Sequence, residues 1–320
     1  MKPTKIKAWP ELVGFLPGLP KLRELQSERS ESAANVEVDF ASVRTVNSTG
    51  LTVFLLRLLE VLAGHKKPVI RRDCQPAILK RLEHLGAFAH LADITGAIEN
   101  ELSLSPLSTV PILADENDSL ALPVHRLRFG TESNRRLPVH RFISWLAENL
   151  GPLRKEYVIE PNGLIILLNE IAKNTADHAR ADALFGLDLI PINNCHSRLT
   201  FAFGDLGIGI KKHIEQNLPA EEENRRQHMS LYEAYRLALK PGYTSSTDTE
   251  LNKGHGMSII IDCAIDLNIH LSVFDALSRG LLSSVSRNEK LSHALVRRIF
   301  HNVGHHLGFF YFGELIVRKR

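Results

Sequence analysis

The sequence has little that would mark a secreted, membrane-spanning or metal-binding protein. Its three cysteines, Cys74, Cys195 and Cys263, lie far apart and form no CxxC pair. This scarcity argues against a disulfide scaffold and a thiolate metal site, and favours a reducing compartment. No apolar run reaches the roughly 18 residues of a membrane span, and prolines break up the segment where a secretory signal would need its apolar stretch. We therefore expect a cytoplasmic protein without membrane contact.

Dense clusters of one charge are also missing. The chain has 39 Lys and Arg against 36 Asp and Glu, and its net charge is +3. Short basic groups such as Lys66-Lys67 and 318–320 are more typical of solvated surface than of a nucleic-acid interface. We expect no direct binding of nucleic acid. With 320 residues, of which 44% are hydrophobic, the chain can form one large domain or two ordinary ones.

Residues 1–100 alternate between short strands and helices. The segments 36–40 and 68–73 are predicted to be strands, and 51–64 and 78–91 helices, because their apolar residues follow the corresponding periods. Strand–helix–strand order implies parallel pairing and therefore an α/β domain.

A change of composition marks the middle of the chain. Residues 101–134 are rich in proline, serine, asparagine and aspartate, and we interpret them as a junction, although 121–129 could form a strand. Residues 135–320 are predicted to form a second α/β unit. Its expected helices are 139–151, 162–180, one near 230–240, and 256–267, and its expected strands are 184–190, 198–205, 269–276 and 309–317.

A polar line interrupts the apolar helix at 167–179, LLNEIAKNTADHA. Glu170, Asn174 and His178 follow at four-residue spacing, which places them on one helical face. One interpretation is a solvated face with local ion pairs, and the other is a wall of a binding site.

Two glycine-containing segments follow this helix in the chain. Asp205-Leu206-Gly207-Ile208-Gly209 ends an apolar strand, and Lys253-Gly254-His255-Gly256 opens an apolar helix after a long polar stretch. Each segment alone has many structural uses. The ordered set of a carboxylate–amide helix, a strand ending in DxGxG and a glycine turn is much rarer.

The residue types in this set suit a nucleotide. Asp205 can accept a hydrogen bond from the exocyclic amine of adenine, whereas guanine presents a carbonyl there. Gly207 and Gly209 permit a close approach of the backbone, and amides around Gly254 and Gly256 at a helix start suit phosphate oxygens.

The remaining candidates concern the metal and the phosphates. Asn174 offers an oxygen ligand for Mg²⁺, and Glu170 could orient or deprotonate an attacking nucleophile. Lys253 and the hydroxyl run 244–247, with Thr244 as the first candidate, could contact phosphates when the intervening segment closes. His178 shares the face of Glu170 and Asn174 and could donate a hydrogen bond.

At these motifs the sequence resembles the GHKL superfamily of ATPases with the Bergerat fold, which includes histidine kinases. Glu170, Asn174 and His178 resemble the N-box, Asp205 to Gly209 the first glycine box, and 254–256 the second. The N-box is most similar to that of the anti-sigma-factor serine kinases. The resemblance covers about 135–320 and implies helices packed on a mixed sheet, with ATP and Mg²⁺ as cofactors. Ser258 and the segment 280–305 depart from the family's pattern.

The first half has a resemblance of its own. VDFASVRTVNSTGL, residues 38–51, is similar to the phosphorylatable turn of STAS domains, with Asn47 in place of the usual aspartate. The resemblance implies that Ser48 is a candidate phosphorylation site. The alternative is that Ser48 only caps a helix.

Three functions follow from these resemblances. The chain could be a serine protein kinase that acts on a STAS-type or sigma-factor-type partner, or on its own Ser48. It could be an ATP-driven binding switch that transfers no phosphate to protein, or a scaffold without ATPase activity. His140, as a phospho-acceptor, and a metal site at His301, His305 and His306 are weaker alternatives. Self-association stays open.

Overall fold

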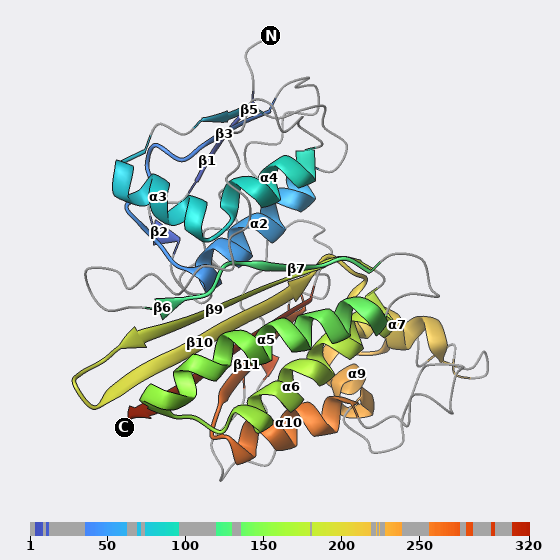
Figure 1. The fold of residues 1–320 in the computed structure, drawn as a ribbon. Coiled ribbons are helices and arrows are strands. Elements are labelled where there is room, and N and C mark those ends of the chain that lie inside the picture. Colours follow the sequence, from blue (N-terminus) through green and yellow to red (C-terminus); the bar gives the residue numbers. More distant parts are fainter. Residues whose placement is uncertain are drawn as a thin grey trace.

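The computed structural model confirms an α/β fold (Figure 1). It describes residues 4–8, 11–12, 36–62, 69–71, 74–95, 120–129, 136–179, 181–218, 222, 224, 228–238, 256–275, 280–283, 296–297 and 309–320. Within these ranges no helix has the length and apolar character needed to cross a bilayer.

The described residues of the N-terminal part form a small parallel sheet and three helices. β1 and β5 each pair with β3 in parallel, as the strand–helix alternation predicts. A second parallel pair joins β2 and β4. The elements of this part are β1 (Thr4–Lys7), β2 (Glu11–Leu12), β3 (Val36–Asp39), β4 (Thr45–Val46), α2 (Ser48–Leu62), β5 (Val69–Arg71), α3 (Pro76–His84) and α4 (Ala87–Thr95).

The single helix expected at 78–91 is wrong, because two helices occupy this region. α3 ends at His84 and α4 begins at Ala87, with Leu85 and Gly86 between them. Gly86 has a φ of 78°, a left-handed conformation that glycine adopts without a steric penalty. The apolar period continues across the break, and for this reason the sequence pattern does not reveal it.

A large sheet dominates the rest of the chain. Its strands run in the order β13-β12-β11-β14-β10-β9-β6, while β7 also pairs with β9 and β8 with β14. Every described pair in this sheet is antiparallel. The strands are β6 (Leu120–Ala121), β7 (His125–Leu127), β8 (Tyr157–Val158), β9 (Ala183–Pro191), β10 (His196–Asp205), β11 (His270–Asp275), β12 (Gly280–Ser283), β13 (Val296–Arg297) and β14 (Phe309–Lys319).

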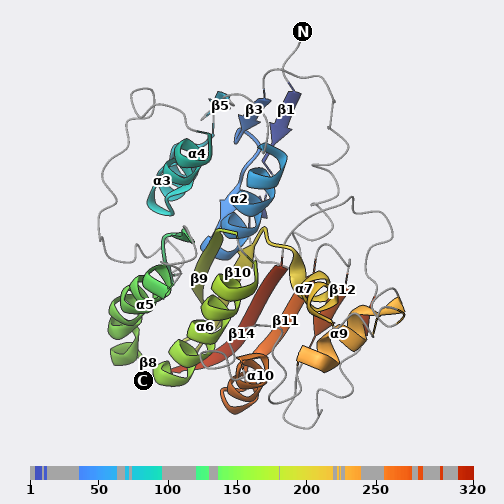
Figure 2. The same ribbon diagram turned by 90° about the vertical axis from the view of Figure 1, so that its right-hand side faces the viewer.

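Helices α5, α6 and α10 cover one face of this sheet, which we name the inner face (Figures 1 and 2). Inner-face side chains such as Phe185, Phe201 and Leu271 join these helices in the larger apolar core. The helices described in this part of the chain are α5 (Arg136–Glu156), α6 (Pro161–Asn174), α7 (Gly209–Asn217), α9 (Leu231–Ala238) and α10 (Gly256–Asp266).

Helix α2 covers the opposite, outer face of the sheet by packing on β9 and β10 (Figure 2). Outer-face residues Leu184, Ala202 and Phe310 share one core with α2 and with Val38 of the small sheet. Because side chains alternate along a strand, β9, β10 and β14 each contribute to both cores. Residues 48–56 of α2 are all buried between the two sheets, which explains why no charged residue occurs in this stretch of the helix.

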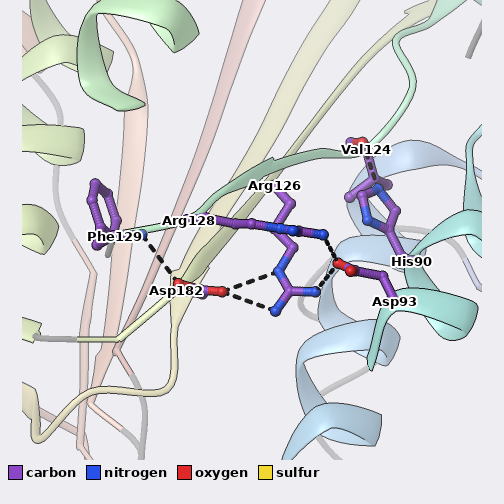
Figure 3. Close-up of polar contacts among 7 residues, drawn as sticks. All are labelled: His90, Asp93, Val124, Arg126, Arg128, Phe129 and Asp182. Atoms are coloured by element: carbon purple, nitrogen blue, oxygen red, sulfur yellow. Dashed lines mark hydrogen bonds and ion pairs between the residues drawn. The ribbon is translucent and has the colours of Figure 1, made fainter. Parts of the chain in front are cut away.

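A group of charged side chains also ties the N-terminal helices to the large sheet (Figure 3). Arg126, which lies on β7, pairs with Asp93 of α4 and with Asp182, whose Oδ2 is 2.8 Å from its Nη2. Arg128 also pairs with Asp93. Nε2 of His90 lies 2.7 Å from the carbonyl oxygen of Val124 and donates to it. The region expected to be a junction therefore supplies strands β6 and β7 and these contacts, while the division of the chain into domains stays a prediction.

Candidate functional site

The polar line on the expected helix at 162–180 spans two kinds of helix in the structure. α6 ends at Asn174, and a π-helical turn, Thr175–Ala179, continues it and carries His178. π-turns frequently occur at functional sites. Glu170 is mostly buried and accepts an ion-paired hydrogen bond of 2.7 Å from Nζ of Lys173. The local ion pair expected for a solvated face is therefore present, although the Glu170 side chain is only 16% exposed.

Asn174 lies near the large sheet. The nearby hydroxyl of Tyr311 is buried on the inner face of β14, and the Asn174 side chain acts to lower the pKa of that hydroxyl. Burial raises the pKa of the Tyr311 hydroxyl, and the nearby Asp205 carboxylate raises it further. Tyr311 therefore lies close to both Asn174 and Asp205. The sequence predicts Asn174 as a ligand of Mg²⁺ and Asp205 as the acceptor for the adenine amine.

Asp205 ends β10 and is buried on the inner face of the sheet. Its Oδ1 accepts a hydrogen bond of 2.7 Å from the backbone N–H of Gly207, which closes a turn directly after the strand. Gly209 has a φ of 73° and begins α7. Gly209 of the predicted DxGxG motif thus lets the chain turn sharply from strand to helix.

His178 lies against α7, which follows that turn. Its ring is 4.4 Å from the ring of His213 between centroids. Burial lowers the pKa of His178 to about 4, so the imidazole is neutral at neutral pH. Its buried Nδ1 has no hydrogen-bond partner among the described residues. A buried ring nitrogen without a partner is unfavourable, and a ligand atom could supply the missing bond.

Of the second glycine segment, residues 253–256, only Gly256 belongs to the described residues. Gly256 begins α10, and this helix packs against α6. Thr244, Lys253 and Gly254 lie outside the described residues. The structure therefore places the π-turn with His178 against α7, the helix that follows Asp205, Gly207 and Gly209. Asn174 and Asp205 both influence the pKa of Tyr311 on β14.

Ser48 lies on the other side of the sheet. It is completely buried at the start of α2, where its Oγ accepts a hydrogen bond of 3.3 Å from the N–H of Leu187. Asn47 caps the helix, because its Oδ1 accepts a 2.8 Å bond from the N–H of Gly50. As placed here, Ser48 is out of reach of solvent and of the inner face.

Asp188 holds this turn on the sheet. The buried Oδ1 and Oδ2 of Asp188 each accept a 2.8 Å bond, from the N–H groups of Ser48 and Thr49. Burial raises the pKa of Asp188 to about 6, although these two bonds act in the opposite direction. A carboxylate at a helix N-terminus also interacts favourably with the helix dipole.

Sequence reasoning missed Asp188, Tyr311 and His213. A signal exists for the first two, since Asp188 is the single charge in the strand LFGLDLI and Tyr311 the single hydroxyl in FFYF. The partners of these residues lie far away in the chain, so the signal does not identify their roles. Among the described residues, no group of three or more His, Cys, Asp or Glu side chains could hold a metal ion.

Comparisons with known proteins do not assign this chain to a family. No family model matches the sequence, and no curated protein matches it. Among solved structures, the chain is similar to the Mycobacterial sensor histidine kinase MprB, at 16% identity and a TM-score of 0.28. That match covers 57% of this chain and 95% of the other. A superposition with this score assigns neither fold nor function.

Proposed function

We propose that this chain is a regulatory protein that binds Mg-ATP on the inner face of its large sheet. The observation that carries the proposal is the clustering of Asn174, Tyr311 and Asp205, which come from three separate elements. An amide, a buried carboxylate and a glycine turn are the residue types that adenine and a magnesium-bound phosphate require.

The residues present fit this ligand. Asp205 would accept the hydrogen bond from the adenine amine, while the turn at Gly207 and Gly209 allows the backbone to approach the nucleotide. Asn174 would hold Mg²⁺, which neutralises phosphate charge when bound. The unpartnered Nδ1 of His178 would hydrogen-bond the ligand. Glu170, paired with Lys173, would orient the nucleophile.

Two uses of ATP agree with this site, and the position of Ser48 helps to distinguish them. A protein serine kinase would act on a STAS-type partner, because the chain's own Ser48 is buried on the outer face. A conformational switch would transfer no phosphate to protein. The burial of Ser48 favours either a substrate in another molecule or the switch, and disfavours transfer to Ser48 within the folded chain.

Calorimetric titration of the full chain with Mg-ATP and Mg-GTP tests the proposal. We expect binding with a preference for ATP, and we expect Asp205→Asn to weaken ATP binding about ten- to hundredfold, since a hydrogen bond to a charged group contributes ~1.5–3 kcal/mol. Asp262→Asn, on an exposed position of α10, is the matched control. If the wild-type chain binds neither nucleotide, the proposal is wrong.

A second measurement separates the two uses of ATP. The chain is incubated with labelled Mg-ATP, and released phosphate and phosphoserine are both quantified by mass spectrometry. Phosphoserine on protein favours the kinase. Released phosphate without phosphoserine, lost in Glu170→Ala, favours the switch.

A further inference from the structure

Arg126 binds two carboxylates that come from distant parts of the chain (Figure 3). Its Nε and Nη2 donate to Oδ2 of Asp182, at 3.2 and 2.8 Å, and its Nη1 donates to Asp93. Asp93 lies on α4 in the N-terminal part, whereas Asp182 directly precedes β9 of the large sheet. Because a guanidinium is planar and its N–H groups have fixed directions, one side chain holds the two carboxylates in a defined arrangement.

Asp182 belongs to a short connection that leads to the candidate site. The π-turn with His178 ends at Ala179, shortly before Asp182, and this turn packs against α7. Both oxygens of Asp182 are used, since Oδ1 accepts a 3.1 Å hydrogen bond from the N–H of Phe129 while Oδ2 accepts from Arg126. The chain just beyond the π-turn is thus anchored through Asp182 to β7 and the residues that follow it.

The bridge formed by Arg126 is partly shielded from solvent. The side chains of Arg126, Asp93 and Asp182 are 18%, 32% and 31% exposed, whereas that of Arg128, which also pairs with Asp93, is 63% exposed. Salt screens partly buried ion pairs less than exposed ones, and exposed pairs contribute little. Arg126 therefore makes the stronger of the two connections to Asp93.

Helix α4 has a second contact with the same part of the large sheet. Nε2 of His90 donates to the carbonyl oxygen of Val124 at 2.7 Å, while α4 also packs on α2. Displacement of α4 would take the Asp93 carboxylate away from Arg126. A guanidinium that keeps only one of its two carboxylates loses a contact that fixes its orientation, so its hold on Asp182 weakens as well.

We propose that Arg126 is a regulatory bridge, through which the docking of α4 controls the order of the π-turn that carries His178. When α4 is docked, Asp93 holds Arg126 on Asp182 and the connection after the π-turn stays in place. When α4 is displaced, Arg126 is released and this connection loosens. The effect of the bridge on a ligand rests on the proposed function, whereas the bridge itself does not.

Hydrogen exchange of the full chain without nucleotide, measured by mass spectrometry over residues 175–183, tests the bridge. We expect Asp93→Asn and Arg126→Lys to speed exchange there about three- to tenfold, because asparagine lacks the charge and lysine lacks the fork that spans two carboxylates. In the Arg126→Lys background, Asp93→Asn should have no further effect. The matched controls are Arg128→Gln, which removes only the exposed pair, and Glu83→Gln, at an exposed position of α3.

The outcomes separate the bridge from the proposed function. Unchanged exchange over 175–183 in both Asp93→Asn and Arg126→Lys overturns the bridge, and so does an equal increase over β14, which would mean that the whole fold is destabilised. If the chain binds Mg-ATP, Asp93→Asn should weaken that binding about two- to fivefold in calorimetric titration. Failure of the wild type to bind ATP overturns the proposed function, while the exchange rates still decide the role of Arg126.

Discussion

Asp188 shows how a single buried charge can attach two parts of a chain. Its two oxygens accept from N–H groups of residues 48 and 49, and the donor and acceptor residues are 140 and 139 positions apart. Burying a carboxylate is unfavourable, and the two bonds and the helix dipole offset much of that loss. Asp188 stabilises the fold mainly because it accepts hydrogen bonds from backbone N–H groups at the start of α2 that would otherwise have no acceptor.

We expect Asp188→Ala to lower the free energy of unfolding by about 2–4 kcal/mol, because it leaves two buried N–H groups without acceptors. Urea denaturation followed by circular dichroism measures the loss. Asp262→Ala, at an exposed position, should change stability by less than about 0.5 kcal/mol. Equal stability of the two variants would show that the Ser48 turn is not held by this carboxylate.

The pH dependence of stability provides a second test of the role of Asp188. Burial raises the pKa of Asp188 from 3.8 to about 6, against the opposing effects of the two N–H bonds, of the Thr49 side chain and of Arg81. The folded state then binds the proton more tightly than the unfolded state, so protonation favours folding. This contribution is full below about pH 4 and is lost as the pH rises through about 6.

We therefore expect the wild type to gain about 1 kcal/mol relative to Asp188→Asn when the pH falls from 7 to 5, because the asparagine cannot titrate. Urea unfolding of both proteins at each pH gives the difference. A gain of the opposite sign would mean that the two N–H bonds lower the pKa below 3.8 and outweigh burial.

At the scale of elements, α2 can approach the sheet closely because glycines replace side chains beneath it. A Cβ atom on Gly186 would lie 2.5 Å from the backbone oxygen of Ser48, and one on Gly204 would lie 2.6 Å from Cδ1 of Leu56. Both distances are too short for real contacts. The two glycines therefore define where α2 lies on β9 and β10.

We expect Gly186→Ala to destabilise the protein by about 1–3 kcal/mol, because the backbone of α2 must move away from the sheet. Gly204→Ala should cost less, because the nearest atoms belong to the side chains of Phe310 and Leu56 and not to the backbone. Gly151→Ala is the control, because nothing lies within 4 Å of that position in α5, and alanine favours a helix by up to about 1 kcal/mol. Thermal unfolding of the three variants measures these effects. Gly186→Ala as stable as Gly151→Ala would contradict the close approach.

Most elements, but not their contacts, could be predicted from the sequence. β9, β10, α10, β11 and β14 agree with the expected segments within a few residues, because their apolar periods are long and clear. Helix α7 was missed, since its start at Gly209 belongs to the predicted turn and its sequence is largely polar. The π-turn was missed because it has the same composition as an α-helix.

For the candidate site as well, the sequence predicts residues that share a face but not the contacts that they make. The spacing of Glu170, Asn174 and His178 indicated a shared face, and the structure does bring Asn174 close to Asp205 through Tyr311. Local spacing carries no information on which strand lies opposite a helix. The hydroxyl of Tyr311 and the docking of Ser48 on Asp188 both depend on long-range pairing, which no short pattern encodes.

At the scale of the whole molecule, the two faces of one sheet connect the N-terminal helix with the proposed nucleotide site. Gly204 faces outward and contacts Leu56 of α2, whereas Asp205, the next residue, faces inward. Leu206 packs again with the outer core. The strand end that carries Asp205 is therefore supported from behind by α2. A shift of α2 would displace the residues on either side of Asp205, since packed interiors transmit strain.

We expect this support to couple α2 docking with nucleotide binding. Asp188→Ala touches no residue of the nucleotide site, yet it should weaken Mg-ATP binding several-fold by loosening α2, as measured by calorimetry under conditions where the variant stays folded. Coupling between two sites is reciprocal, so Mg-ATP should slow hydrogen exchange at the amides of Ser48 and Thr49 in the wild type.

The control amides for this exchange experiment lie on β8, at Val158, which pairs with the far end of β14. If Mg-ATP slows exchange there as much as at Ser48 and Thr49, the ligand stabilises the protein globally and α2 has no special role. Slower exchange confined to Ser48 and Thr49, together with weaker binding in Asp188→Ala, would make α2 the element through which the N-terminal part and the nucleotide influence one another. The outer face would then act as a regulatory surface for a site on the inner face, with Gly204 and Asp205 as the adjacent residues that join them.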